Sequence, residues 1–205
     1  MRTLRNRIAA ATLAACALMA AACGPIASNP IALQYTPRNF LNPAAGAEGV
    51  AVRIVVNDRR TGRSLGNVED HSGTPIAPIF ATGNIADTLA HAISDGLATR
   101  GFNVVANAPV FVTVDLKHFD CQFQSSMLAA SATARMVIDV TVARAGGPPV
   151  FSQRFSGSGT STGFETASSE NAKPALDRAL SSAVNQVIVD SGFIAALESA
   201  SRAPA

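Results

Sequence analysis

The sequence predicts an α+β fold of two layers, in which a mainly antiparallel sheet packs against two amphipathic helices. Segments that alternate apolar and polar residues recur along the chain, and two other segments repeat apolar residues at helical spacing. Such strands have one apolar face and such helices have one apolar stripe, so each needs a partner to cover it. At 205 residues the chain is long enough for one such domain with appendages.

The first strand has the clearest alternation. Apolar residues occupy every second position in 50–56, which indicates a strand covered on one side, and the polar cluster 58–62 ends it in a turn. Weaker strands are expected over 64–70, 76–81 and 102–105.

A first helix is expected over 84–100. Asn84 is a suitable N-cap, Asp87 complements the helix dipole in the first turn, and Gly101 follows the last turn. The residues that share its apolar face are Ile85, Leu89, Ile93 and Leu97.

Three strands in the second half are predicted to form an antiparallel meander with one polar face. The first opens after Pro109, the second is centred on 136–142 and the third on 151–155. A loop is expected at 121–126 and a turn at 145–149, where glycines and prolines cluster.

A second amphipathic helix is expected over 170–189, and a short helix over 193–199 before a frayed tail. The residues on the inner face of the longer helix are Leu176, Leu180, Val184 and Val187. The two amphipathic helices and the half-buried sheet complete the predicted fold.

The first residues have the three parts of an export signal. A basic stretch ends at Arg7, an apolar stretch covers 8–19, and small residues at 20–22 precede Cys23. The uncharged run of about 15 residues is shorter than the ~20 that a membrane-spanning helix needs. A cysteine directly after the small residues is the acceptor for a diacylglyceryl group, so we expect a lipoprotein whose mature chain begins at a lipidated Cys23.

Cys16 is the alternative lipidation site. Leu13 lies three residues before it, which matches the usual lipobox better, but cleavage there would leave an apolar stretch of only 8–15. A third interpretation is an ordinary secreted protein cleaved after an Ala-x-Ala site. Gly24 follows Cys23 where an aspartate would signal inner-membrane retention, so the outer membrane is favoured over the inner membrane.

The choice of anchor decides what the remaining cysteine can do. If Cys23 is lipidated, Cys121 is the single thiol left, and a buried, small apolar residue is a more common role for it than a reactive thiol or an intermolecular bridge. If Cys16 is the anchor, Cys23 and Cys121 could pair in the oxidising periplasm.

These patterns divide the chain into four parts: a signal peptide at 1–22, a lipidated cysteine and extended tether at 23–48, a single α+β domain at 49–198, and a disordered tail at 199–205. Prolines among small polar residues indicate the tether, although alternation of apolar residues in 31–35 also allows a short edge strand there.

The charge balance argues against nucleic acid as a partner. The whole chain carries a net charge of +2, but three arginines lie in the leader, so the mature chain is close to −1. Trp is absent and Tyr35 is the single tyrosine, which disfavours a binding site built on aromatic stacking.

The chain resembles the YajG family of bacterial lipoproteins. The resemblance is carried by the lipobox, the strand that ends in Asp58 and Arg59, the helix exit at 98–102, the strand opened by Pro109 and the late helix over 175–189. It implies a membrane-anchored protein that faces the periplasm, with unassigned biochemical activity and no catalytic residues to transfer. A similar pattern occurs in auxiliary lipoproteins of ABC-type transport systems.

Few residues qualify as a site. Asp58, Arg59 and Arg60 at a strand end are the candidates for contact with a partner, although a turn with an Asp-anchored backbone bond and solvated arginines is the commoner interpretation. We predict no catalytic, metal or cofactor site, because each apparent motif has a simpler explanation. The apparent motifs are the helical stripe Asp87, His91 and Asp95, the unconnected His71 and His118, and the glycines Gly157, Gly159 and Gly163. The glycines lack the lysine of a phosphate loop, so we interpret them as a flexible loop.

Three function classes follow in order. The first is a non-enzymatic envelope lipoprotein that binds or assembles with a protein partner through the exposed sheet face or a strand edge. The second is an auxiliary lipoprotein of an ABC-type transporter that handles a lipid or other apolar ligand, which would need an apolar concavity between sheet and helices. A periplasmic enzyme comes last.

Overall fold

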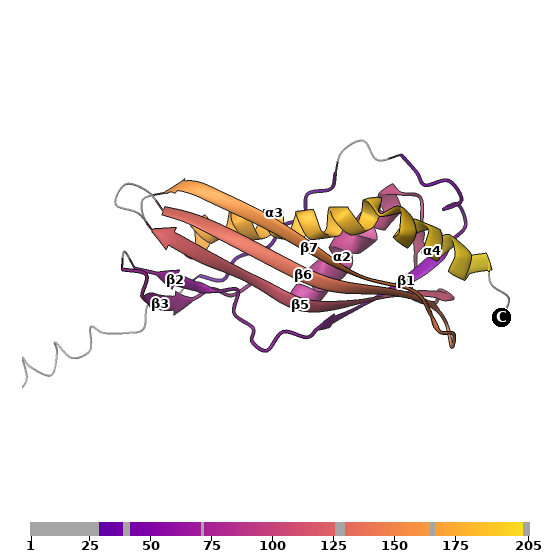
Figure 1. Ribbon diagram of the computed structural model, residues 1–205, viewed down its shortest axis with the longest axis horizontal. Coiled ribbons are helices and arrows are strands. Elements are labelled where there is room, and N and C mark those ends of the chain that lie inside the picture. The colour runs from indigo at the N-terminus through magenta and orange to yellow at the C-terminus, as the bar shows by residue number, and fades with distance from the viewer. Residues whose placement is uncertain (1–28, 39–41, 71, 126–129, 165–166, 203–205) are drawn as a thin grey trace, which may run out of the picture.

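The computed structural model describes residues 29–38, 42–70, 72–125, 130–164 and 167–202 (Figure 1). The predicted signal peptide, Cys16 and Cys23 therefore lie outside the described residues. The elements in chain order are β1 (Ala51–Asp58), β2 (Asn67–Glu69), β3 (Pro75–Pro78), α2 (Ile85–Thr99), β4 (Asn103–Val104), β5 (Val110–Ser125), β6 (Ala130–Arg144), β7 (Pro149–Phe164), α3 (Ser169–Val189) and α4 (Ser191–Arg202).

The main sheet has the strand order β4-β1-β5-β6-β7. Strands β5, β6 and β7 form the predicted antiparallel meander, whereas β1 lies parallel to both β4 and β5. Figure 1 shows the three long strands side by side with α2 and α3 behind them on one face. The predicted α+β class is confirmed, with a small antiparallel pair, β2 and β3, beside the main sheet.

The core lies between this sheet face and the helices. Alternate residues of β5 and β6 are buried on the helix side of the sheet, where α3 packs against β5, β6 and β7 and α2 packs against β1 and β4. The predicted inner faces of both helices are buried as well. Each helix is capped by a side chain: Asn84 accepts a hydrogen bond from the amide of Ala86, and Ser168 accepts one from the amide of Asn171.

The predicted loop at 121–126 is wrong, because β5 continues to Ser125. A bulge between Leu116 and His118 shifts the register against β6, and with it the phase of the alternation. After the bulge the buried positions are Phe119, Cys121 and Phe123 instead of a continuation of the even-numbered series. A change of phase within one strand interrupts the period-2 pattern and therefore looks like the end of a strand.

The glycines that we interpreted as a flexible loop belong to β7 instead. They let α3 approach the strand closely: a Cβ atom at Gly157 would lie 2.1 Å from the Ala179 carbonyl oxygen, and one at Gly159 would lie 2.2 Å from the Ala175 carbonyl oxygen. A side chain does not fit at either position.

Residues 199–202 are not part of a disordered tail. Helix α4 follows α3 after a single residue and continues to Arg202, with Ala200 buried. The Arg144 side chain at the end of β6 donates a hydrogen bond to the Ala200 carbonyl oxygen at 3.1 Å, which ties the last turn to the sheet.

Part of the predicted tether is fixed to the domain. Ile31 is buried, and its backbone pairs with the chain on either side of Ala81: its amide donates to the Phe80 carbonyl oxygen at 2.9 Å, and its carbonyl accepts from Thr82 at 2.7 Å. The predicted edge strand is thus a single bridge.

Residues 34–38 then form a strap along α3. The amides of Gln34, Thr36 and Arg38 donate to three α3 side chains at 2.8, 2.9 and 3.1 Å. The acceptors are spaced four residues apart: Asp177, Ser181 and Asn185. Two residues of extended chain rise about 6.8 Å and four helical residues about 6 Å, so the two spacings match. The tether is therefore a docked segment over these residues.

Candidate functional site

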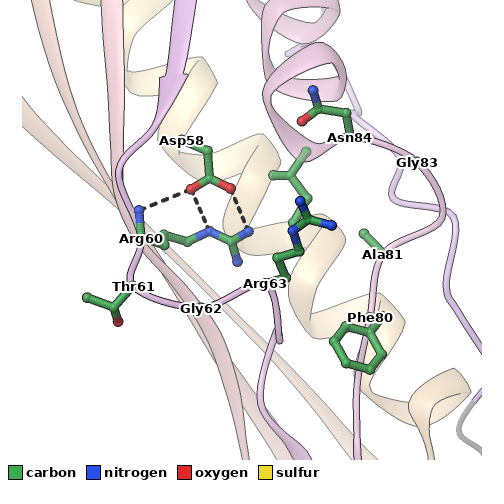
Figure 2. A pocket seen from close by; sticks show the side chains of 10 residues that line it. Asp58, Arg60, Thr61, Gly62, Arg63, Phe80, Ala81, Gly83 and Asn84 are labelled. Atoms are coloured by element: carbon green, nitrogen blue, oxygen red, sulfur yellow. Dashed lines mark hydrogen bonds and ion pairs between the residues drawn. The ribbon is translucent and has the colours of Figure 1, made fainter.

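A pocket of about 900 Å³ opens where β1 ends and α2 begins (Figure 2). One wall comes from the loop after β1 and the other from the chain between β3 and α2. The lining residues are Asp58, Arg60, Thr61, Gly62, Arg63, Phe80, Ala81, Gly83, Asn84 and Ile85. The first wall is polar and charged, whereas Phe80, Ala81 and Ile85 make the second partly apolar.

Asp58 and Arg60 form an ion pair within the polar wall. The Arg60 Nε and Nη2 atoms donate to the two Asp58 carboxylate oxygens at 2.9 and 2.8 Å, and the Arg60 amide donates to Oδ1 at 3.1 Å (Figure 2). These hydrogen bonds from Arg60 hold the pKa of the Asp58 carboxyl below its ordinary value. The predicted turn with an Asp-anchored backbone bond is confirmed.

The prediction that both arginines are solvated is wrong for Arg60, whose side chain is only 6% exposed. Its Nη1 atom donates to the carbonyl oxygens of Ser64 and Phe119 at 3.3 and 3.4 Å. β1 pairs with β5 as far as Asp58 and Leu116, and pairing along the same edge resumes at Gly66 and Cys121. Arg60 therefore supplies the missing hydrogen bonds where the strand edge is interrupted, a structural role.

Arg59 lies on the opposite side of the sheet from this pair. Its side chain is 59% exposed and lies 3.6 Å from an Asp115 carboxylate oxygen on the open face. The predicted cluster of Asp58, Arg59 and Arg60 is thus divided between the pocket and the open sheet face, because consecutive residues at a strand end point to opposite sides.

The open face carries a row of ionic and polar contacts that crosses four strands, from β1 to β7. Asn57 donates to Asp115 at 2.9 Å, Lys117 lies 3.0 Å from Asp115 and 3.9 Å from Asp139, and Arg154 donates to Asp139 at 2.7 and 3.0 Å. The Asn57 hydrogen bond lowers the pKa of Asp115, and Arg154 lowers that of Asp139. Sequence reasoning missed this row, because only the register brings its members together.

Arg63 is the cation in the pocket that remains available. It is exposed and has no hydrogen bond or ion pair with any described residue. Figure 2 shows its side chain extending from the loop toward the start of α2, with Phe80 on the neighbouring chain. An exposed guanidinium in the same pocket as an aromatic ring suits an anionic group attached to an apolar body.

The other residues weighed from the sequence form no cluster. Asp87, His91 and Asp95 are all exposed on α2, and no group of three potential metal ligands occurs within the described part of the chain. His118 lies 2.8 Å from Asp120, and His71 is outside the described residues. Cys121 is buried, and burial raises its pKa to about 12, which agrees with the small apolar role.

Taken singly, none of the helices in the described ranges is long and apolar enough to cross a bilayer. Helices α3 and α4 reach that length and composition only as a pair, which bends by 56° at its junction.

The fold and the site define a two-layer α+β domain with an open polar sheet face and a pocket at the end of β1. Residues 41–198 match a family described as uncharacterized lipoproteins. The chain belongs to this family of YajG-like lipoproteins, so the resemblance seen in the sequence is confirmed. No match was found among curated proteins.

Two solved structures are similar to this chain at low sequence identity. A protein from Xanthomonas campestris is 13% identical with a TM-score of 0.51, over 79% of this chain and 90% of that one. A homolog of a neuraminyllactose-binding hemagglutinin from Helicobacter pylori is 7% identical with a TM-score of 0.49, over 82% of this chain and 97% of that one. The likeness concerns the fold alone.

Proposed function

We propose that this lipoprotein is anchored to the periplasmic side of the outer membrane through a diacylglyceryl group on Cys23, and that its domain binds a protein partner without acting as an enzyme. Membership of a lipoprotein family supports a place in the cell envelope. The leader supports the anchor, because small residues directly precede Cys23 and Gly24 follows it.

The open sheet face is the surface we propose for the partner. The other face is covered by helices, and the free edge of β7 is occupied by α3: Gln186 donates to the Ser156 carbonyl oxygen at 2.8 Å and Arg178 donates to that of Thr160. A strand edge capped in this way is a poor template for β-augmentation. The open face instead presents hydroxyl and amide side chains and the ionic row around Asp115 and Asp139. The predicted contacts at Asp58, Arg59 and Arg60 now depend on Arg59, which lies on this face.

Site-specific photocrosslinking in the native host tests the face. A photoreactive phenylalanine at Thr133, exposed on β6, should give one discrete crosslinked product, whereas the same residue at Ala195, exposed on α4, should not. Equal products at both positions, or none at Thr133, would contradict binding through the sheet.

Membrane fractionation tests the anchor. A Cys23→Ser variant should leave the membrane fraction, Cys16→Ser should not, and the lipidated chain should sediment with outer membranes in a density gradient. A Cys23→Ser protein that stays with the membrane would make Cys16 the anchor.

The auxiliary-lipoprotein function in ABC-type transport is the second candidate. The observation in its favour is the apolar wall of the pocket, which could hold part of a lipid beside the Arg63 guanidinium. This function would need an apolar concavity between the sheet and the helices, whereas the pocket lies at the end of the sheet and has a charged wall. Native mass spectrometry with lipid extraction distinguishes the two candidate functions, since a purified domain that carries no lipid would count against transport. Permease genes adjacent to the gene for this chain would favour transport.

A further inference from the structure

Two large apolar side chains are exposed on the segment that ends in the pocket wall. Ala77 and Ile79 point inward and are buried, whereas Ile76 and Phe80, which alternate with them, are 42% and 39% exposed. Pro78 lies between them on the same outward side and is also exposed. We call Ile76, Pro78 and Phe80 the apolar edge.

The chain that arrives from the leader joins the domain directly beside this edge. The Ile31 amide bonds to the carbonyl of Phe80 itself, and Ile31 is buried in the core. The strap over 34–38 is hydrogen-bonded to α3, so the residues after Ile31 add no length to the linker between Cys23 and the domain. Figure 1 shows β2 and β3 at one end of the molecule and α4 toward the other.

The distance that a lipid on Cys23 allows is short. Ile31 is eight positions after Cys23, and eight fully extended residue steps span at most about 28 Å. In every orientation of the domain, therefore, Phe80 stays within roughly that distance of the bilayer surface. The Val110 end of β5 is less constrained, since about 36 Å of strand separates it from Cys121, which pairs with Gly66 beside Ile79.

The charges around the edge suit a bilayer surface. Arg63 shares the pocket with Phe80 and has no ion-pair partner in the described part of the chain, so its guanidinium could contact a lipid phosphate. The charge of Asp58 is already matched by Arg60. Glu69, which lies on β2 opposite Pro75, would stay at the hydrated rim.

We infer that the apolar edge is a membrane-contact surface, where Phe80 and Ile76 enter the boundary between phospholipid headgroups and acyl chains and Arg63 contacts a phosphate. This inference rests on the proposed anchor at Cys23. Contact would orient the domain, with its β2–β3 end on the bilayer and its open sheet face available to a partner in the periplasm.

Single tryptophans test the contact cleanly, because the chain contains none of its own. The full lipidated protein is reconstituted into vesicles of phosphatidylethanolamine and phosphatidylglycerol, with and without brominated phosphatidylcholine. Phe80→Trp reports on the apolar edge, and Val150→Trp, at a valine that is 52% exposed at the start of β7, is the matched control. Circular dichroism checks that both variants fold, and vesicle flotation is measured on the same samples.

We expect both variants to float with the vesicles, and only Phe80→Trp to shift its emission to shorter wavelength and lose a large part of it to the brominated lipid. Adding Ile76→Asp should diminish that loss without affecting flotation. Flotation without quenching at residue 80, or equal quenching at 80 and 150, would overturn the inference while leaving the anchor intact. Failure to float would instead refute the anchor, and the inference with it.

Discussion

The guanidinium of Arg60 is held by the carboxylate of Asp58, two residues earlier, at 2.8 and 2.9 Å, and from that position it reaches the carbonyl oxygen of Phe119 on β5. Between the end of β1 and Gly66 the chain does not pair with β5, and the Asp58–Arg60 pair replaces the hydrogen bonds that are missing there. This relationship makes Arg60 a structural residue and its neighbour Arg59 a surface residue.

Replacing each arginine by alanine should separate these roles. Arg60→Ala leaves the carbonyls of Ser64 and Phe119 without their donor, so we expect it to lower the free energy of unfolding by about 2–4 kcal/mol. Arg59→Ala removes an exposed contact and should cost less than about 1 kcal/mol. Urea unfolding of the chain from Gly24 onward measures both, and similar losses for the two variants would refute the assignment.

The pair also makes stability depend on pH. The pKa of Asp58 in the folded protein lies below its ordinary value of 3.8, so its stabilising effect is complete above that value and is lost as the pH falls toward the folded pKa. Asp58→Asn should therefore destabilise the protein more at pH 7 than at pH 3, which is below the ordinary pKa of the carboxyl. Urea midpoints at both values give this difference; a constant difference would mean that Asp58 acts without its charge.

Asn185 holds the strap by three hydrogen bonds, to the Tyr35 hydroxyl, the Arg38 amide and the Thr36 carbonyl. Asn185→Ala should lower stability by about 1–2 kcal/mol and speed hydrogen exchange of the amides at 34–38. Tyr35→Phe removes one of these bonds and should have the smaller effect. If exchange in the strap is already as fast as in an unfolded chain before mutation, the segment is not docked in solution.

The approach of α3 to β7 makes a strong prediction for Gly157. Its Cβ would meet backbone on α3 that cannot move without the helix, so Gly157→Ala should lower stability by about 3 kcal/mol. Gly147 is the matched control, since its Cβ would have ordinary contacts, the nearest at 3.5 Å. Thermal unfolding compares the two, and a tolerated Gly157→Ala would mean that the strand and helix are further apart.

Cys121 should be unreactive in the folded domain. It is 2% exposed, and burial raises the pKa of its thiol to about 12, so almost no thiolate is present at neutral pH. In the chain from Gly24 onward, a thiol reagent should label Cys121 only after denaturant is added. Rapid labelling of the native protein at pH 7.5 would show that β5 opens there.

Much of the fold could be predicted because its signals are local. The period-2 alternation at 50–56 and 110–116 and the helical spacing of Leu89 and Ile93 reflect one buried face each, and caps such as Asn84 depend on the next few residues. For the same reason Asp58 could be assigned to a turn. The predicted export signal and the predicted lipobox at Cys23 are also contiguous patterns, and they stay predictions because these residues lie outside the described part of the chain.

The candidate site depended on tertiary structure. Asp115, Asp139 and Arg154 lie on three strands, and only the register of the sheet places them in one row. Arg60 and Phe119 meet because β1 ends beside a bulge in β5, and Phe80 and Arg63 share a pocket although 17 positions separate them in the chain. Sequence alone determined most of the elements and the family resemblance. Long-range packing decided the rest, because a contact between distant segments depends on register and approach, which no local pattern encodes.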